Sequence, residues 1–371
     1  MQFIDLAKQQ SLIKPALDKR IQDVLAHGKY IMGPEVKELE AQLAEYVGVK
    51  YCVCCSSGTD ALLMPLMAWG VGPGDAIFTT PFTFIATAEV IQLLGATPIF
   101  VDIDPKTYNI SPELLDVAIN KVIEAGELNP KAIIPVDLFG HPADHVAIEL
   151  ISKKYDIKIL EDAAQGLGGH IDDRKAGSFG DAAATSFFPA KPLACYGDGG
   201  AIFTNDDELY EKLVSVRVHG KGGDKYDNIR IGLNGRMDTL QAAIVLEKFT
   251  LFPNELKLRN EVAAKYNSLL SDRVVTPQVE DGYSSAWAQY SILANDAEDR
   301  AALQAKLKDA GIPTAVYYPK PLHQQTAFGH LSDKDGDFPV SEEMSQRIFS
   351  LPMYPYLETA DIETICGVIN G

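Results

Sequence analysis

Residues 132–162 read AIIPVDLFGHPADHVAIELISKKYDIKILED, and this stretch indicates how the chain folds. Two short apolar runs, Ala132–Asp137 and Lys158–Asp162, flank a helical pattern over His145–Lys154. Short runs of continuous apolar residues are typical of strands covered on both faces, and a helix between two such runs is typical of a parallel βαβ unit. The stretch therefore predicts an α/β fold with a mostly parallel sheet.

The same alternation of short apolar runs and helical patterns recurs along the first 250 residues. Further strand-like runs are Tyr51–Cys55, Ala76–Thr80, Pro98–Asp102, Ala183–Phe187 and Gly200–Thr204, and further helical patterns are Asp60–Trp69 and Thr87–Leu94. We therefore expect a seven-stranded sheet sandwiched by helices. This sheet would form a large domain over residues 1–250, whose N-terminal segment packs on the remainder of the chain.

The pattern changes after about Leu251. A long helical segment (Glu255–Leu270) precedes a strand-like run at Ser285–Ala294, a helix at Asp299–Ala310 and a segment punctuated by proline at Pro313–His323. This order of elements predicts a smaller α+β domain over residues 251–371.

Composition excludes several classes of function. The chain has 371 residues and a formal charge of -18, which argues against binding to nucleic acid or to an anionic membrane. It has neither an N-terminal signal pattern nor an apolar run long enough to cross a membrane, so we expect a cytoplasmic protein. The five cysteines fit neither a disulfide framework nor a metal knuckle, so we expect them to be structural and expect no metal.

Ligands of open α/β sheets bind beyond the carboxyl ends of the strands, so the turns that follow the apolar runs are the candidate sites. Ser56–Asp60 joins the first run to a helix, where free N–H groups and the helix dipole favour an anion, although these residue types also serve as plain N-caps. Phe82 and Phe84 follow the second run, either as core residues or as a stacking surface for a ring.

Asp162 ends a later apolar run, and Gln165 follows it by three residues. An ionised carboxylate in such a place needs a cationic partner. Two interpretations stay open: a structural carboxylate that caps a helix, or a carboxylate that keeps the ring nitrogen of an electron-sink cofactor protonated.

Lys191 stands in SFFPAKPLACYGDGG (186–200), where no neighbouring residue is typical of a surface. Burial lowers the pKa of an amine and makes it a competent nucleophile and base. The glycines at 197, 199 and 200 permit a close approach of backbones. Alone, such a lysine is also typical of a surface loop. Together with the residues at the other strand ends, it favours a cofactor site.

Taken together, these segments resemble the sugar-nucleotide aminotransferases, a family of fold-type I enzymes that use pyridoxal 5'-phosphate (PLP). The resemblance covers essentially the whole chain, and the family landmarks appear in family order. They are FIDLAKQQ (3–10), KYIMGPEVKELE (29–40), SSGTDAL (56–62), PFTFIATAE (81–89), VDIDPKTYNI (101–110), EDAAQGLGG (161–169), the lysine segment (186–200), GLNGRMDTLQAA (232–243) and YYPKPLHQQTAF (317–328). So many ordered matches are far more specific than one short motif.

The resemblance implies roles for individual residues around the PLP ring. Lys191 would bind the cofactor covalently and move the proton in catalysis, and Asp162 would pair with the pyridinium nitrogen. Gln165 would lie beside the ring hydroxyl, and Phe84 would stack on the ring face.

The resemblance also implies how the phosphate of PLP is held. Gly58, Thr59 and Ser186 would bind this phosphate from the same chain. Asn234 would reach it from the second subunit of a homodimer.

The reaction that the resemblance implies is transfer of an amino group from L-glutamate to a keto sugar nucleotide. Related dehydratases have histidine in place of the lysine, so Lys191 favours amino transfer. The matches point to UDP-2-acetamido-2-deoxy-3-oxo-glucuronate as the acceptor, in the synthesis of cell-surface polysaccharide such as lipopolysaccharide O-antigen. Two alternatives stay open: an aminotransferase for a neutral 3-keto or 4-keto dTDP- or UDP-6-deoxy sugar, and a non-catalytic regulator that binds PLP or a sugar nucleotide.

Several residues are candidates for contact with the sugar nucleotide. A bidentate arginine suits the carboxylate of a glucuronate, and Arg236 is the candidate, although it is also typical of a helix start at a dimer contact. The remaining candidates are Tyr317, Tyr318 and His323 of the smaller domain, and His219 and Arg230, which flank a glycine-rich segment typical of either a lid or a solvated loop. Tyr317 departs from the histidine found in relatives with this substrate.

Overall fold

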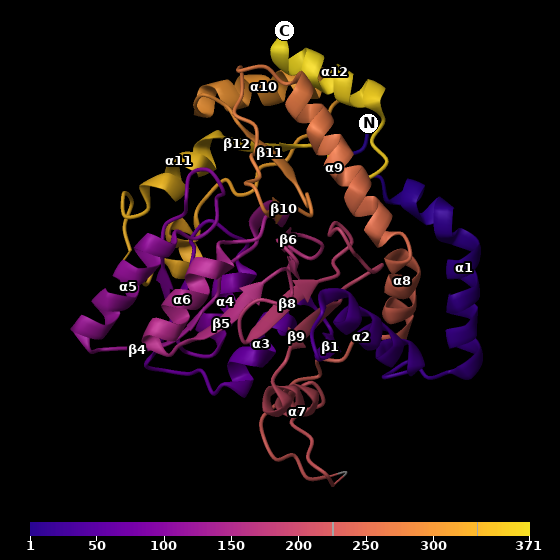
Figure 1. Cartoon of the computed structure of the whole chain (residues 1–371), viewed down its shortest axis with the longest axis vertical. Helices are drawn as coiled ribbons and strands as arrows, with labels where there is room; N and C mark the ends of the chain where they lie inside the picture. The colour runs from indigo at the N-terminus through magenta and orange to yellow at the C-terminus, as the bar shows by residue number, and fades with distance from the viewer. Residues whose placement is uncertain (225, 332) are drawn as a thin grey trace.

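The computed structural model describes residues 1–224, 226–331 and 333–371. At its centre is a seven-stranded sheet in the order β1-β9-β8-β5-β4-β2-β3 (Figure 1). Its strands are β1 (Tyr51–Cys55), β2 (Asp75–Thr79), β3 (Thr97–Phe100), β4 (Asn129–Ile133), β5 (Lys158–Asp162), β8 (Ala182–Ser186) and β9 (Gly200–Thr204). Within this sheet β9 is antiparallel to both of its neighbours, and the other pairs are parallel. The predicted seven-stranded, mostly parallel sheet is confirmed.

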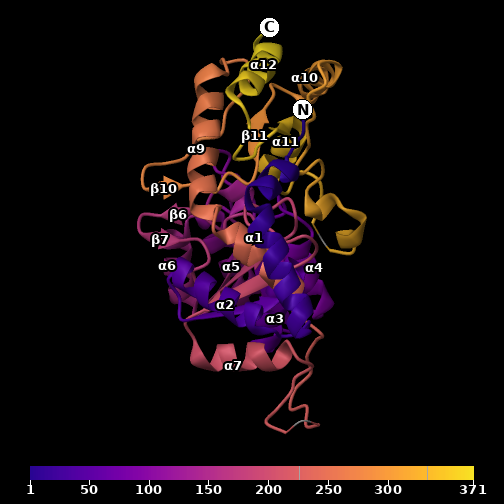
Figure 2. The ribbon, with the colours of Figure 1, turned by 90° about the vertical axis from the view of Figure 1, so that its right-hand side faces the viewer.

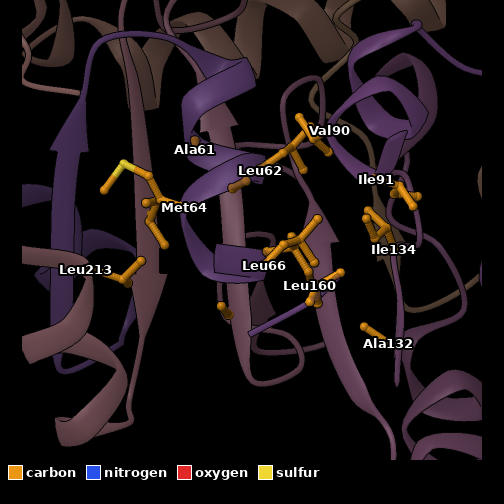
Figure 3. Close-up of a cluster of buried hydrophobic side chains, with 14 of the residues drawn as sticks. Ala61, Leu62, Met64, Leu66, Val90, Ile91, Ala132, Ile134, Leu160 and Leu213 are labelled. Carbon is orange, nitrogen blue, oxygen red and sulfur yellow. The ribbon is translucent and has the colours of Figure 1, made fainter. Parts of the chain in front are cut away.

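Helices cover both faces of the sheet because side chains alternate along each strand. The helices of this part of the chain are α1 (Leu6–His27), α2 (Pro34–Val47), α3 (Gly58–Ala68), α4 (Ala86–Leu93), α5 (Pro112–Ala125), α6 (His145–Tyr155), α7 (Asp207–Val216) and α8 (Thr239–Phe249). On one face α3, α4 and α7 pack against the sheet, with Leu62 and Leu66 of α3 beside Leu160 of β5 (Figure 3). On the other face lie α2 and α8, and α5 and α6.

The rest of the chain builds a second core beside the large sheet. Its elements are α9 (Phe252–Leu269), β10 (Tyr283–Ser284), β11 (Tyr290–Leu293), α10 (Ala297–Asp309), α11 (Pro339–Arg347), β12 (Ile348–Leu351) and α12 (Thr359–Asn370), with single 3-10 turns at Leu322–Gln324 and Thr326–Phe328. The pair β11–β12 is antiparallel, and β10 joins β6 (His170–Ile171), which pairs with β7 (Arg174–Lys175). None of the described helices combines the length and the apolar character that crossing a membrane requires.

The N-terminal segment contacts both parts of the chain. Ile4 packs against the second core, and the carbonyl oxygen of Phe3 accepts a hydrogen bond from Met353 N. Further along, α1 lies against α8 through Ile13 and Leu17 (Figures 1 and 2). The predicted boundary at residues 250/251 falls between α8 and α9. The division into two domains stays a prediction.

Two strands differ by three or more residues from the runs expected from the sequence, and the runs Ala76–Thr80, Pro98–Asp102 and Ala183–Phe187 agree with their strands to within two residues. The run predicted over Ala132–Asp137 forms a strand that begins earlier, at Asn129, and ends at Ile133, shortly before Pro135, which has no N–H group to donate to the ladder. In the run predicted over Ser285–Ala294, the strand is limited to Tyr290–Leu293, since Trp287 has a left-handed backbone with φ 49°. Sequence alternation does not reveal either interruption.

The sequence predicts that the five cysteines are structural residues outside any disulfide. All five are free, and all five are buried. Cys52, Cys54 and Cys55 lie on β1, and burial raises the pKa of the Cys55 thiol well above its usual value. A thiol in this environment is a poor nucleophile, so these residues act as small apolar side chains.

Two turns at the carboxyl edge of the sheet touch through glycines. A Cβ atom on Gly200 would lie within 3.0 Å of the carbonyl oxygens of Ser57 and Thr185. A Cβ atom on Gly58 would lie 2.6 Å from Cβ of Ser186. The turn after β1 is therefore in backbone contact with the end of β8, as the predicted close approach at Gly200 requires.

Replacing Gly200 by alanine should destabilise the fold, because the new methyl group meets backbone atoms that have no space to move. We expect Gly200→Ala to lower the free energy of unfolding by about 1–3 kcal/mol. Urea denaturation followed by circular dichroism measures this change. Gly223→Ala is the control, since nothing lies within 4 Å of a Cβ atom there. An equal loss in both variants would contradict the close approach.

Candidate active site

The carboxyl ends of three parallel strands bring the predicted residues to one edge of the sheet. Asp162 is the last residue of β5, Ser186 is the last residue of β8, and Ser56 follows β1. Strands β5 and β8 are direct neighbours, and Asp162 is opposite Ala184 in their register. Lys191 follows β8 by five residues, so the topology places the lysine turn beside the end of β5.

The Asp162 carboxylate is buried and held at both oxygens. Thr87 donates from its hydroxyl to Oδ2 at 2.8 Å, and the N–H of Ala164 donates to Oδ1 at 3.1 Å. Burial raises the pKa of Asp162, whereas these hydrogen bonds and the positive charge of Lys191 oppose the rise. The site therefore favours a cation in front of this carboxylate.

Lys191 is partly buried at the same place. Removal from water lowers the pKa of its amine to about 8, and the negative charge of Asp162 partly opposes this shift. An ordinary lysine has a pKa near 10.5, so Lys191 is far more often neutral near physiological pH. A neutral amine in the field of a buried carboxylate is a nucleophile and a base.

Gln165 connects Asp162 to the smaller part of the chain. Its Oε1 accepts a hydrogen bond from Phe139 N at 2.8 Å, and its Nε2 donates to the hydroxyl of Tyr318 at 3.1 Å. The ring of Tyr318 lies 6.4 Å from that of Phe84. Phe84 is 54% exposed, which is unusual for a phenylalanine between a strand and a helix. Its ring is therefore free to stack on a ligand.

The turn after β1 has the features of an anion cradle. Ser57 is the N-cap of α3, accepting from Asp60 N, and the N–H groups of Gly58 and Thr59 belong to the first turn, where a helix has no internal acceptors. The contact between Gly58 and Ser186 brings a hydroxyl group to the same helix end. A phosphate is the anion that such a helix N-terminus binds well.

Arg236 and Asn234 return to this edge from the segment that follows α7. Arg236 bridges to Cys55 at the end of β1, and Ser56 N donates to the carbonyl oxygen of Gly235. The buried Nε of Arg236 has no hydrogen-bond partner among the described residues, and Asn234 is exposed. Arg236 Nε is thus left without an acceptor from the described residues, and Asn234 is open to solvent.

The structure does not bring every predicted residue to an open position. The His323 side chain is 1% exposed, its Nε2 lies 3.1 Å from Glu342 Oε1, and its ring lies against Phe338. Tyr317 is partly buried beside Tyr318. The His323 ring is therefore occupied by internal contacts, and a role in substrate binding stays a prediction without structural support.

His219 and Arg230 lie on a segment that projects away from the sheet beyond α7 (Figures 1 and 2). His219 is exposed, and its carbonyl oxygen accepts from Asn228 Nδ2 at 2.8 Å. A Cβ atom on Gly220 would lie within 3.0 Å of the Arg230 backbone, so the backbone is in close contact between these two positions. This segment does not cover the site of its own chain.

One contact at the site was missed by the sequence prediction. Thr87 supplies the hydroxyl group that holds Asp162, although 75 residues separate the two. The residue lies within PFTFIATAE, in the first turn of α4. A threonine in a helix has many ordinary roles, so its type and spacing gave no signal for this hydrogen bond.

The described residues fit PLP on several independent grounds. The exposed ring of Phe84 suits the ring of PLP, and the helix N-terminus beside the Ser186 hydroxyl suits its phosphate. The buried carboxylate of Asp162 suits its pyridinium nitrogen, and the Lys191 amine of lowered pKa suits its aldehyde. Fold and site together define a fold-type I PLP-dependent enzyme.

Comparison with known proteins identifies the family. Residues 12–370 match the model of the DegT/DnrJ/EryC1/StrS aminotransferase family, and the chain belongs to that family. It is 49% identical over 372 residues, covering 100% of both chains, to the UDP-2-acetamido-2-deoxy-3-oxo-D-glucuronate aminotransferase of Pseudomonas aeruginosa. It is 43% identical over 360 residues, covering 96% of this chain and 94% of the relative, to a pleiotropic regulatory protein of Geobacillus stearothermophilus.

Solved structures show the same fold. A DegT DnrJ EryC1 StrS aminotransferase from Brucella abortus superimposes with a TM-score of 0.97 at 53% identity, covering 100% of this chain and 99% of the other. NtdA of Bacillus subtilis, with the cofactor pyridoxamine phosphate bound, has a TM-score of 0.87 at 30% identity, covering 100% of this chain and 83% of the other. The predicted cofactor and the predicted class, a PLP-dependent transaminase, are confirmed.

The lowered pKa of Lys191 predicts the pH dependence of PLP capture by the PLP-free protein. Because the neutral amine is the nucleophile, the rate of covalent capture should rise from pH 6 and level off above about pH 8. Asp162→Asn should lower the pH at which the rate is half its maximum, the midpoint of the profile, because it removes the anion that favours the ammonium form. Stopped-flow absorbance measures the rate.

Lys191→Ala is the control for that experiment and should capture no PLP covalently. The account of the site would be contradicted by a midpoint near 10.5, the ordinary lysine value, in the unmodified protein. It would also be contradicted by a midpoint that Asp162→Asn leaves unchanged.

Proposed function

We propose that this enzyme transfers the amino group of L-glutamate to UDP-2-acetamido-2-deoxy-3-oxo-glucuronate. The observation that carries the reaction is the pair of Lys191 and Asp162, whose charges act on each other at adjacent strand ends. The choice of acceptor is supported by full-length identity of 49% to the Pseudomonas aeruginosa enzyme named for that substrate. Such amino sugars would serve the synthesis of cell-surface polysaccharide, including O-antigen.

Lys191 is the proposed acid and base of the reaction. PLP, when bound, supplies an aldehyde that accepts the amino group and a ring that delocalises the electrons released at the substrate carbon. The Lys191 amine would take the proton from the donor carbon that carries the amino group, and the ammonium group so formed would return that proton later in the transfer. Its lowered pKa suits both directions near neutral pH.

Asp162 and Gln165 are proposed to orient the cofactor ring through its nitrogen and its hydroxyl group. The buried carboxylate of Asp162, fixed by Thr87, would keep the ring nitrogen protonated in both half-reactions. Gln165, fixed by Phe139 N and Tyr318, would hold its amide beside the ring hydroxyl. Phe84 would stack on the ring, and Gly58, Thr59 and Ser186 would bind the phosphate.

Arg236 is the proposed contact for the carboxylate of the acceptor sugar. Its Nε is buried and has no partner among the described residues, and its backbone lies against Cys55 at the end of β1. A buried donor without a partner is costly, so an acceptor supplied by a ligand would stabilise it. Tyr317 and Tyr318, from the smaller part of the chain, are proposed as further contacts for the acceptor sugar.

We propose that the enzyme is a cytoplasmic homodimer. The segment with His219 and Arg230 projects away from its own sheet and carries Ile229 and Ile231, which are 56% and 86% exposed (Figure 1). Apolar side chains on a projecting segment are suited to a protein contact. A second copy would bring this segment, with Asn234, to the phosphate and nucleotide of the first.

Two alternatives differ from this proposal in measurable ways. An aminotransferase for a neutral 3-keto or 4-keto sugar nucleotide would use the same residues around PLP and would not need Arg236. The other alternative, a regulator without turnover, is supported only by the name of the Geobacillus stearothermophilus relative, 43% identical. Loss of the visible PLP absorbance on addition of glutamate separates an enzyme from a regulator.

Titration of the PLP-loaded enzyme with nucleotide amino sugars, run in the reverse direction, should identify the acceptor. We expect UDP-2-acetamido-3-amino-glucuronate to remove the visible absorbance of bound PLP, and neutral 3-amino and 4-amino sugars to leave it. Removal by a neutral sugar alone would contradict the proposed acceptor. If neither the sugars nor glutamate changed the spectrum, the reaction itself would be contradicted.

Replacing Arg236 by alanine should lower kcat/KM for the acidic sugar about 10- to 100-fold, the effect of losing a charged hydrogen-bond pair. The kcat/KM of the same variant for a neutral sugar should stay within about twofold of that of the unmodified enzyme. Arg273→Ala, which removes a surface pair with Asp299, is the control for loss of an arginine. An equal loss with both sugars would contradict the role of Arg236.

A further inference from the structure

A buried polar cluster lies on the side of β5 that faces away from Asp162. It consists of Asp137, His145 and Glu161, which are all fully buried. One carboxylate oxygen of each acid and one ring nitrogen of the histidine lie within 4.8 Å of one another. Glu161 directly precedes Asp162 on β5, and successive side chains of a strand point to opposite faces. Glu161 and Asp162 therefore lie on opposite faces of the same strand.

Hydrogen bonds fix most polar atoms of this cluster. Asp137 Oδ1 accepts from Ala143 N at 2.9 Å and lies 2.8 Å from His145 Nε2. The two oxygens of Glu161 accept from Gly177 N at 2.7 Å and from Phe179 N at 2.9 Å. Asp137 Oδ2 is buried and has no partner among the described residues.

A proton on Glu161 would supply the missing donor. Two adjacent carboxylates cannot both stay ionised in a dry environment. Burial, followed by the negative charge of Asp137, raises the pKa of Glu161 well above its usual value. A protonated Glu161 can donate to Asp137 Oδ2 while His145 donates to Oδ1, so that both oxygens of Asp137 are paired.

We propose that Glu161 holds a proton at neutral pH and donates it to Asp137 in a hydrogen bond, and that this Glu161–Asp137–His145 cluster positions Asp162 and Gln165 for the reaction. The inference rests on the roles given to Asp162 and Gln165 in the proposed function. All three cluster members are positioning residues, since they act through other groups and do not face the cofactor.

Contacts connect the cluster directly to both site residues. Asp137 N donates to the carbonyl oxygen of Asp162 at 3.0 Å. Phe139, two residues after Asp137, donates from its N–H to Gln165 Oε1. A Cβ atom on Gly166 would lie within 3.0 Å of the Asp137 side chain, so the turn after Gln165 rests on that carboxylate. A change in the pairing of Asp137 therefore reaches both residues through the backbone.

The geometry favours a shared proton over a metal ion. The 2.8 Å between Asp137 Oδ1 and His145 Nε2 is a hydrogen-bond distance, and each Glu161 oxygen already accepts a backbone N–H. The His145 ring is also stacked on Phe179, with centroids 4.2 Å apart and planes 3° apart. An ion would need about 2 Å to each ligand atom and would have to break these contacts.

Several charged and titratable groups act on the cluster from the surrounding elements. They are Asp162 on β5, Glu149 on α6, Arg174 on β7, and His141 and Tyr283 from the connecting segments. The anions Asp162 and Glu149 would favour retention of the proton, and the Arg174 cation would oppose it. The test therefore leaves all five unchanged in its main variants.

Infrared spectroscopy of the full-length enzyme at pH 8 tests the proton directly, since ordinary carboxyl groups are ionised there. We expect a carboxylic-acid C=O band in the unmodified enzyme. Asp137→Asn should remove the band, because its amide group can donate to Glu161 and let that residue ionise, and Glu161→Gln should remove it too. Glu124→Gln, at an exposed position of α5, should leave the band in place.

Three results would overturn the proton assignment. They are the absence of an acid band in the unmodified enzyme, a band that survives in both cluster variants, and a band that disappears in Asp162→Asn alone. A fourth result would come from elemental analysis by mass spectrometry. If the unmodified enzyme held one metal ion per chain and Asp137→Asn held none, the cluster would bind a metal ion and not a shared proton.

Steady-state kinetics of PLP-loaded Asp137→Asn test the positioning role. We expect kcat about tenfold lower, with KM for both substrates within about twofold, as for other residues that orient a reacting group from behind. Loss of the infrared band with unchanged kcat would overturn the positioning role. Lack of amino transfer in the unmodified enzyme would instead contradict the proposed function and would leave the infrared result standing.

Discussion

The interaction between the opposite charges of Lys191 and Asp162 is the one on which the rest of the site depends. Burial disfavours the charged form of each residue, and the charge of each residue partly opposes the pKa shift that burial causes in the other. Neither residue would be tolerated alone in this position without a partner. The sheet order brings them together, because Asp162 ends β5 and Lys191 follows the adjacent strand β8.

Sequence reasoning located these residues because strand ends can be predicted. Continuous apolar runs mark buried strands, and the bounds of β1, β5 and β9 agree with the runs Tyr51–Cys55, Lys158–Asp162 and Gly200–Thr204. Chemistry-bearing residues that follow such runs meet at one edge of a parallel sheet. Fold class and the centre of the site were therefore accessible without coordinates.

Contacts between distant segments were not accessible in the same way. The hydrogen bond from Gln165 to Tyr318 joins residues 153 positions apart, and the one from Thr87 to Asp162 depends on how α4 packs. The burial of His323 against Glu342 likewise follows from tertiary packing, which residue type does not reveal. Glu161 and Asp162 are neighbours in sequence, yet they face different environments. Burial raises the pKa of both, but the positive charge of Lys191 opposes the rise at Asp162, whereas the negative charge of Asp137 adds to it at Glu161.

Covalent attachment at Lys191 is the central claim, and reduction of the PLP-loaded enzyme with borohydride tests it most directly. Reduction converts a carbon–nitrogen double bond between PLP and an amine into a stable single bond, which peptide mass spectrometry can then locate. The account predicts one pyridoxyl group per chain, on the peptide that contains Lys191. A pyridoxyl group on another lysine, or none on the PLP-loaded protein, would contradict it.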